Sequence, residues 1–331
     1  MKKNTNLRMW LSGALIVQLI LIAVVFNTSK NTEQPENRNL IPAQSNIDRV
    51  VIADNKVQSE LLRDGDHWIL PNLQNLPVDA KKWQAQLDKL NTQQLRWPVA
   101  SSSTSHERFD VSNEKFNKRI DLYSEQSLVS SFYIGSSLGL KESYVRELEN
   151  DKTFTVDLNA ADLPSDDNTW LDKKLLQLDQ ITTLKTQTFE LEKRDNTWVL
   201  VQGASDIAED QSSQSKERLS ISDGELSTDQ PINIDIIQEK VIEIENALSS
   251  LIILSTASGV IIDSSDSLTA VNKMGTTNYS FSTEGGKYYV DSNNSSGTFE
   301  ISKSTYEKLA NLSIDKILEE REQKNDVEEN Q

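Results

Sequence analysis

The chain has 331 residues, with 51 acidic against 34 basic side chains and no cysteine. Its formal net charge of −17 repels phosphate backbones and anionic headgroups, so we expect no nucleic-acid partner and no body lying flat on a membrane. The missing thiols exclude disulfides, cysteine nucleophiles and zinc sites built on sulfur.

The N-terminus predicts a membrane anchor. An apolar run occupies residues 9–26, broken only by three polar or small residues. As a helix, these 18 residues span about 27 Å, close to the hydrocarbon core of about 30 Å. The alternative is a cleavable signal peptide, but bulky Val25 and Phe26 stand where small residues mark a cleavage site. We therefore expect an uncleaved transmembrane helix, with residues 1–26 forming its cytoplasmic start and the anchor.

The charges flanking the apolar run predict its orientation. Lys2, Lys3 and Arg8 precede it, and only Lys30 follows closely. The positive-inside rule then places the N-terminus in the cytoplasm and the body outside, which in a bacterium means a single-pass inner-membrane protein with a periplasmic body. Residues 27–46 are polar with two prolines and predict a flexible linker reaching about 25 Å.

One eleven-residue phrase occurs twice. "ELLRDGDHWIL" at residues 60–70 returns as "ELEKRDNTWVL" at residues 190–200. Each predicts a β-hairpin with a tryptophan in its second strand, and Asp64-Gly65 is a favoured tight-turn pair. A helix is predicted after each hairpin, in "PVDAKKWQAQLDKL" with Asp79 as N-cap and in "NIDIIQEKVIEIENALSSL" with Asp235 as N-cap. The order hairpin, helix, strands therefore occurs twice.

Short strand patterns complete both halves. The first half contains "IDRVVIAD", "KRIDLYSE", "SLVSSFYIG", "ESYVRELE" and "KTFTVDL", and the second contains "DQITTLKTQT", "GVIIDSS", "TNYSFSTE", "GKYYVDS" and "GTFEISK". "KTFTVDL" and "GTFEISK" read as corresponding strands. A duplicated unit is the economical explanation. We expect an α+β fold of two repeats, each with antiparallel strands, a Trp-bearing hairpin and one amphipathic helix, at residues 47–160 and 181–315.

Three segments fall outside this repeat. An acidic, Ser-rich loop at 202–230 interrupts the second repeat. The connector at 161–180 is expected to form a short helical turn over residues 173–178, packed by Trp170, Leu175 and Leu176. The charged tail at 316–331 has too little apolar content to dock.

No pattern identifies a chemistry. "GSSLG" places Ser137 in the letters of a nucleophile elbow, but that motif needs a strand, a turn and a helix, with a histidine downstream. Here both flanks read as strands, and His67 and His106 precede the serine. His67 also has a threonine, Thr197, as its counterpart in the second phrase. We therefore interpret the motif as a hairpin loop and His67 as an exposed strand residue.

The acidic side chains give no specific signal either. With 51 acids, close pairs arise by chance, as in Asp162/Asp166/Asp167, Asp263/Asp266 and Glu243/Glu245. "DSNNSSG" at Asp291 departs from a calcium loop in the place of its glycine and lacks the glutamate at the twelfth position. Among the tryptophans, Trp68, Trp83 and Trp198 are interpreted as core, while Trp97 and Trp170 stay open. We expect no catalytic, cofactor-binding or metal-binding residues.

The ordered motifs resemble an uncharacterised bacterial family, a domain of unknown function. Its members have a membrane span, an "I..V.I" strand, a "..L.R.G..W.L" hairpin, a "PVDA" helix start, an "IG…YVR" strand pair, a "W.DK.LL.L…I" connector and a second Trp hairpin. The corresponding text here covers residues 47 to about 255. The resemblance implies genes that neighbour gliding-motility-type ABC transporters, and therefore an auxiliary extracytoplasmic subunit. It supplies no catalytic residues.

These observations favour a non-enzymatic, membrane-anchored periplasmic accessory protein that contacts ABC transporter subunits or other envelope proteins and needs no cofactor. An envelope hydrolase, or a ligand-binding domain with its site between the two repeats, is the alternative. A cleft that gathers buried carboxylates or a Ser/His pair would favour the alternative.

Overall fold

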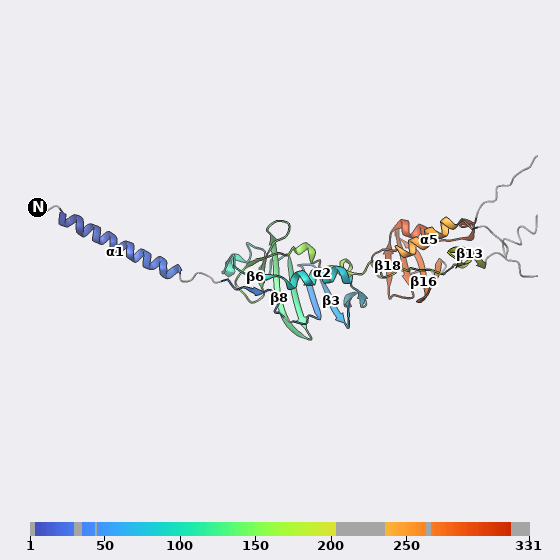
Figure 1. Cartoon of the computed structure of the whole chain (residues 1–331), viewed down its shortest axis with the longest axis horizontal. Helices are drawn as coiled ribbons and strands as arrows, with labels where there is room; N and C mark the ends of the chain where they lie inside the picture. The colour runs from blue at the N-terminus through green and yellow to red at the C-terminus, as the bar shows by residue number, and fades with distance from the viewer. Residues whose placement is uncertain (1–3, 30–34, 44, 203–235, 263–265, 319–331) are drawn as a thin grey trace, which may run out of the picture. The chain divides into compact units, whose positions relative to one another are not determined.

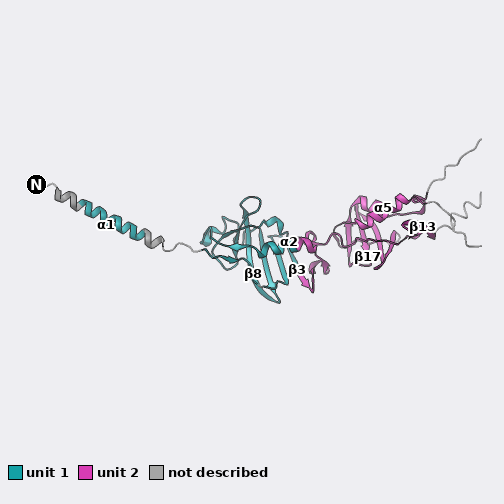
Figure 2. Ribbon diagram, in the orientation of Figure 1, with its two compact units in different colours: residues 1–60, 84–165 teal, residues 61–83, 166–331 magenta. Residues whose placement is uncertain are grey.

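The protein is described by a computed structural model that covers residues 4–29, 35–43, 45–202, 236–262 and 266–318 (Figure 1). Most of the predicted acidic loop, and the Asp235 cap, lie outside these residues. The chain divides into two compact units, residues 1–60 with 84–165 and residues 61–83 with 166–331 (Figure 2). The fold is a mixed α+β fold with antiparallel sheets and few helices, as predicted.

The apolar N-terminal run forms helix α1 (Asn4–Ser29). Its side chains are described from Trp10 to Val24, and the large apolar ones among them are 54% to 79% exposed. Within the part of the chain that the structure describes, no helix is long and apolar enough to cross a membrane.

The first sheet has eight strands in the order β10-β9-β8-β7-β2-β3-β4-β5. Their bounds are β2 (Arg49–Ala53), β3 (Gln58–Asp64), β4 (His67–Leu70), β5 (Leu76–Pro77), β7 (Lys118–Ser124), β8 (Ser127–Ser137), β9 (Ser143–Glu147) and β10 (Phe154–Val156). Its central strands β2, β7 and β8 bury their β-branched and aromatic side chains, as in Ile52, Ile120 and Phe132, which are fully buried. The expected strands of the first half are thus confirmed.

The first hairpin has a two-residue loop. Asp64 pairs with His67, so Gly65 and Asp66 form the turn, one residue later than the predicted Asp64-Gly65 pair. In the second hairpin, Arg194 pairs with Thr197. Both hairpins therefore share one register relative to their tryptophans.

Helix α2 (Ala80–Asn91) begins as predicted. The Lys82 N–H donates to Asp79 Oδ1 at 3.0 Å, which is the contact of an N-cap. Trp83 and Leu90 are fully buried on its inner face. The predicted cap and core face are confirmed, because capping and helical periodicity are both local signals.

Part of the predicted linker is ordered. Strand β1 (Arg38–Asn39) pairs antiparallel with β6 (Gln94–Leu95). Leu40 and Ile41, which follow β1, are 1% and 3% exposed. The expectation of a flexible tether is wrong for this stretch, because two apolar residues in a polar segment are enough to dock it.

The second sheet follows the order β13-β12-β11-β15-β16-β17-β18-β14. Its strands are β11 (Thr183–Lys185), β12 (Glu190–Arg194), β13 (Thr197–Gln202), β14 (Ile253–Ala257), β15 (Ser267–Asn272), β16 (Gly275–Glu284), β17 (Lys287–Ser292) and β18 (Thr298–Ile301). In both sheets a Trp hairpin is followed by the strand that precedes it in the chain and then by a four-stranded meander. β10 and β18, which lie within "KTFTVDL" and "GTFEISK", end the two meanders.

Two strands of the second half differ from the prediction. "GVIIDSS" was expected as a strand, but residues 259–262 are not in a strand and Ile261 is 88% exposed. The strands are instead β14 before it, paired with β18, and β15 after it, paired with β11 and β16. Which residues form strands here is decided by the strands they pair with, and the local sequence pattern does not contain that information.

Helix α5 (Gln238–Ser249) buries Val241, Ile244 and Leu248, in agreement with the predicted apolar face. It starts three residues after Asp235, so its beginning does not reproduce that of α2. The Gln238 side chain instead binds both backbone groups of Trp198, accepting its N–H at 3.0 Å and donating to its carbonyl at 2.8 Å. The amide thus satisfies part of the outer edge of β13.

The other helices within the described residues are short. They are α3 (Asp167–Trp170), α6 (Lys303–Leu309) and the 3₁₀ turns η1 (Pro71–Leu73), η2 (Ser103–Ser105), η3 (Ala160–Asp162) and η4 (Ile314–Lys316). In the connector, a hydrogen-bonded turn at residues 173–176 stands where the short helical turn was expected. Trp170 is fully buried edge-on against Trp83, with ring centroids 5.4 Å apart, so Trp170 is a core residue.

Candidate functional site

Ser137 is the last strand residue before the bend that connects β8 to β9. Its Oγ is 3.4 Å from the Oγ of Ser143 at the start of β9. Gly135 in the same motif has a packing reason, because a Cβ there would lie 2.0 Å from the carbonyl oxygen of Phe109. The strand–turn–strand context agrees with the predicted hairpin loop.

The two histidines have other surroundings than Ser137. His67 is exposed at the start of β4. His106 is 8% exposed, and its Nε2 lies 2.8 Å from the carbonyl oxygen of Asp151. Within the described residues, neither histidine is hydrogen-bonded to Ser137, so no Ser/His pair forms there.

The carboxylates considered from the sequence serve local structure. Their contacts are Asp162 with Lys89 (2.8 Å), Asp166 with the N–H of Asn168 (3.1 Å), Glu243 with Lys240 (3.3 Å), Glu245 with Lys193 (2.8 Å), Asp266 with the N–H of Asn311 (2.7 Å) and Asp291 with the N–H of Ser292 (2.7 Å). Asp263 lies outside the described residues. Among the residues that the structure describes, no three His, Asp or Glu side chains gather to hold a metal.

A serine, a lysine and an aspartate do meet elsewhere. Lys118 Nζ donates to Ser165 Oγ at 2.8 Å and to Asp54 Oδ2 at 3.1 Å, and Ser165 Oγ donates to Asp54. The Ser165 hydrogen bond is the main reason that the pKa of Asp54 lies well below its usual range. A lysine paired with an ionised carboxylate is not a general base, and Ser165 is only 4% exposed. This trio is therefore a structural brace.

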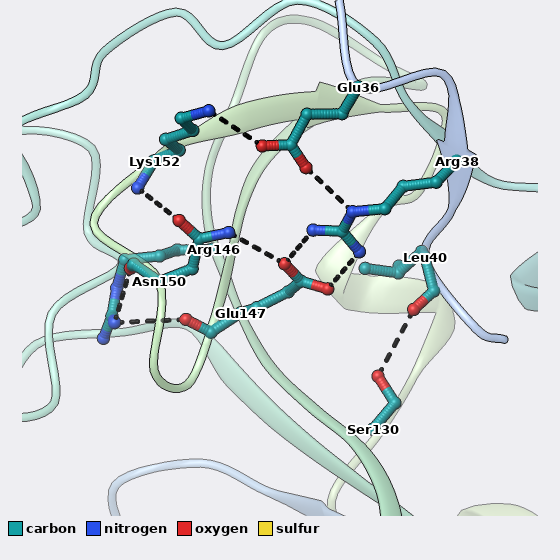
Figure 3. Close-up of polar contacts among 8 residues, drawn as sticks. All are labelled: Glu36, Arg38, Leu40, Ser130, Arg146, Glu147, Asn150 and Lys152. Carbon is teal, nitrogen blue, oxygen red and sulfur yellow. Dashed lines mark hydrogen bonds and ion pairs between the residues drawn. The ribbon is translucent and has the colours of Figure 1, made fainter.

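The densest polar arrangement joins the N-terminal segment to the β9 end (Figure 3). Arg38 Nη1 donates to Glu147 Oε1 at 2.6 Å, and Nη2 donates to the other oxygen of that carboxylate. Arg38 Nε donates to Glu36 at 2.8 Å, and Lys152 Nζ donates to the second Glu36 oxygen at 3.0 Å. Asn150 Nδ2 donates to Glu147 at 3.0 Å. We call these five residues the Arg38 clamp.

The clamp is partly shielded from solvent. The side chains of Arg38 and Glu147 are 41% and 22% exposed. Burial raises the pKa of Glu147, but the hydrogen bonds from Arg38 and Asn150 outweigh it and lower the pKa below its ordinary value. The hydrogen bond to Glu147 likewise raises the pKa of Arg38. The bidentate geometry strengthens the Arg38–Glu147 ion pair, but its partial exposure limits its contribution to the free energy of unfolding to about 1 kcal/mol.

Arg146 supports the clamp from inside. It is 4% exposed and donates to the carbonyl oxygens of Val111 at 2.6 Å and Leu148 at 2.9 Å, and to Asn113 Oδ1 at 2.7 Å. Its guanidinium also lies 4.8 Å from the centroid of the Tyr133 ring. Burial lowers the pKa of Arg146. The fixed guanidinium holds the turn after β9, and with it Glu147.

Three hollows lie in the first unit. One of about 710 Å³ includes Arg146 and His106, and one of about 250 Å³ includes Arg38 and Leu128. The third, of about 640 Å³, includes Trp97 and the end of β10. The first two border the clamp but bring no nucleophile and base together. Both linings contain polar and charged side chains, so they could bind a polar group but offer no catalytic pair.

Sequence reasoning missed the clamp. Arg38 and Glu147 are 109 positions apart, and neither stands in a motif. The only local signal was Arg146, in the "YVR" stretch of a predicted strand. Side chains alternate between the two faces of a strand, so an apolar, core-facing Val145 predicts that Arg146 faces solvent. It is buried because residues 111–113 cover that face.

These features define an α+β protein with two eight-stranded antiparallel sheets and a polar clamp, and with no catalytic constellation among the described residues. The chain belongs to the family described as Domain of unknown function (DUF4340), whose model matches residues 68–270. The match confirms the part of the predicted resemblance that assigns the chain to an uncharacterised domain family. No curated protein and no solved structure matches the chain.

Proposed function

We propose that the protein is a non-enzymatic, membrane-anchored accessory protein whose body lies outside the cytoplasm and contacts an ABC-type transporter. The observation that carries the anchoring is the exposure of apolar side chains on every side of α1, as in the consecutive Leu19, Ile20, Leu21 and Ile22 at 57% to 63%. A helix that is apolar all round is stable when lipid or protein surrounds it. The 18-residue apolar run of the sequence supports the same proposal.

The clamp supports a body held close to the anchor. Only residues 30–34 separate α1 from the segment that the clamp docks. That length of chain spans at most about 20 Å when fully extended. A body on so short a tether would stay near the bilayer, where the extracytoplasmic faces of transporters are accessible.

Three strongly exposed apolar side chains give positions at which contacts can be mapped. Leu140, Ile261 and Met274 are 88% to 94% exposed outside the strand interiors. Single exposed side chains are ordinary, but these offer convenient positions for contact mapping. The transporter itself is proposed from the family resemblance. The common strand order of the two sheets further supports our proposal that the body arose by internal duplication.

In-cell crosslinking tests the partner. We would place a photoreactive amino acid at Leu140, Ile261 or Met274 in the full chain, irradiate intact cells and identify the adducts by mass spectrometry. Transporter subunits crosslinked from at least one position are the expected result, and the buried position Leu90 serves as the matched control. Adducts confined to unrelated proteins, or equal yields from Leu90, would refute the partner.

A topology experiment tests the anchor separately. Alkaline phosphatase fused at the C-terminus is expected to be active, because that enzyme folds outside the cytoplasm, whereas a fluorescent protein that folds only inside is expected to be dark. Deleting residues 9–26 should reverse both outcomes. An active cytoplasmic reporter on the full chain would refute the orientation.

A further inference from the structure

The hollow beside Trp97 has the features of a ligand site. Trp97 is 57% exposed, whereas Trp83, Trp170 and Trp198 are at most 1% exposed. Exposing an indole forgoes about 2 kcal/mol or more of burial, so a purely structural tryptophan belongs in a core. Trp97 instead borders a hollow of about 640 Å³, within the roughly 300–1,000 Å³ of ligand pockets.

The lining of this hollow is polar and mixed in character. Besides Trp97 it presents an amide, a guanidinium, two carboxylates and a hydroxyl, from Gln94, Arg96, Glu142, Asp157 and Thr155. Donors and acceptors therefore occur side by side. Within the described residues, the carboxylates of Glu142 and Asp157 have no hydrogen-bond partner, so both are available to a ligand.

Two strands carry part of this lining. Gln94 lies on β6, which pairs with β1, and Thr155 lies on β10. The buried Gln93 side chain joins two elements, donating to the carbonyl of Lys89 at 2.8 Å and accepting the N–H of Asp157 at 2.8 Å. This bridge ties the end of α2 to the residue that follows β10, so the backbone on these two sides of the hollow is fixed by hydrogen bonds.

The charges and shape exclude several ligand classes. One cation against two carboxylates repels phosphates and other anions. A peptide added as a strand would need the outer edge of β10, but Val99 and Ala100 already occupy it at Thr153, with hydrogen bonds of 2.7 and 2.9 Å. Only Trp97 and buried Val156 are apolar, so no pocket anchors a large apolar side chain.

We propose that this hollow binds a carbohydrate, with the exposed Trp97 indole stacked against the C–H face of one sugar ring. A sugar ring has one apolar face and many hydroxyls, each a donor and an acceptor. The carboxylates of Glu142 and Asp157 accept hydrogen bonds from those hydroxyls, the Gln94 amide can donate as well as accept, and Arg96 adds charge-assisted donors. This inference concerns a site in the first unit and does not depend on the transporter partner.

Fluorine NMR of the full chain tests the site. The protein, labelled with 5-fluorotryptophan and held in a detergent without a sugar headgroup, gives six resonances, one per tryptophan. The Trp97→Phe variant assigns the resonance of Trp97. We would titrate triacetylchitotriose, maltotriose and cellotriose to millimolar concentration. The expected result is a saturable shift of the Trp97 resonance with at least one of them, while the other five stay unchanged.

Variants separate this site from surface effects. Gln94→Ala should weaken the saccharide affinity at least threefold, and Trp97→Ala, measured by calorimetry, at least tenfold. Val99→Ala is the matched control, because Val99 is 46% exposed two residues away and does not line the hollow; its affinity should be unchanged. No shift with any of the three saccharides overturns the proposal. A parallel titration uses an equimolar mixture of unstructured decapeptides. A shift of the Trp97 resonance with these peptides but with none of the saccharides also overturns the proposal, because it would assign the hollow to peptides.

Discussion

Replacing Gly135 by alanine tests whether the "GSSLG" motif serves packing rather than chemistry. The added Cβ would lie 2.0 Å from the carbonyl oxygen of Phe109 and 2.7 Å from that of Asp110. Carbon and oxygen normally approach to roughly 3.3 Å. The loop at residues 109–111 must therefore move by about 1 Å, because both atoms belong to the backbone and no rotamer change relieves the contact.

The displaced loop takes two hydrogen bonds with it. The Ser136 N–H donates to the Phe109 carbonyl at 3.0 Å, and Arg146 Nε donates to the Val111 carbonyl at 2.6 Å. Losing the first costs about 1 kcal/mol, and leaving a buried charged donor unsatisfied costs about 2–3 kcal/mol. We expect Gly135→Ala to destabilise β8 and β9 by about 3–4 kcal/mol. Ser136→Ala, which removes only the hydroxyl bond to Asp110, should cost about 1 kcal/mol.

Hydrogen exchange followed by mass spectrometry measures this locally. Amides of β8 and β9 should lose protection by more than about 100-fold in Gly135→Ala, since about 1.4 kcal/mol corresponds to a factor of ten. Ser136→Ala should lose about fivefold. The reasoning is refuted if Gly135→Ala exchanges within tenfold of the wild type and residues 109–111 keep their protection.

Three further predictions follow from the packing and the clamp. The pKa of Glu147 is lower in the folded state, because the hydrogen bonds from Arg38 and Asn150, together with the charge of Arg38, outweigh the burial that raises it. Its contribution to stability is therefore present above the unfolded value near 4.5 and is lost as the pH falls through the lower folded pKa. The protection factor of the clamped segment, taken relative to the intrinsic exchange rate at each pH, should fall below pH 4.5, and Glu147→Gln should abolish that dependence; a wild-type protection factor that stays constant contradicts it. Trp83→Ala, at a fully buried ring, should cost about 3–5 kcal/mol by urea denaturation, and a loss under 1.5 kcal/mol would argue against a packed core there. Tyr279→Phe removes the hydroxyl that donates to the Leu176 carbonyl at 3.0 Å and should cost about 1–2 kcal/mol; unchanged exchange of the connector would contradict it.

Local signals predicted the fold well where they were complete. The N-cap at Asp79 and the spacing of Trp83 and Leu90 are each contained in a few consecutive residues, and so is the first hairpin turn, which lies one residue later than predicted. β14 and β15 were missed because the apolar "VII" run at 260–262 looks like a strand in isolation. Pairing with β18 and β11 stabilises the flanking residues instead, and those partners lie tens of residues away.

The site was less predictable than the fold. The clamp depends on a contact between residues 109 positions apart, and single charges in a chain with 85 charged side chains carry no local signal. Trp97 stayed open in the sequence because neither helical nor strand periodicity includes it. Only the three-dimensional arrangement shows that it is exposed beside a hollow.

The position of the clamp has a mechanical consequence. If α1 is held and the body is pulled, load enters through the segment that begins at residue 35. It meets first the ion pairs of Glu36 and Arg38, then the short β1–β6 ribbon, and then the buried Leu40. Only after these have yielded does tension reach β2 in the sheet. Under such a load, this segment would detach and lengthen the tether before the tension strained the sheet.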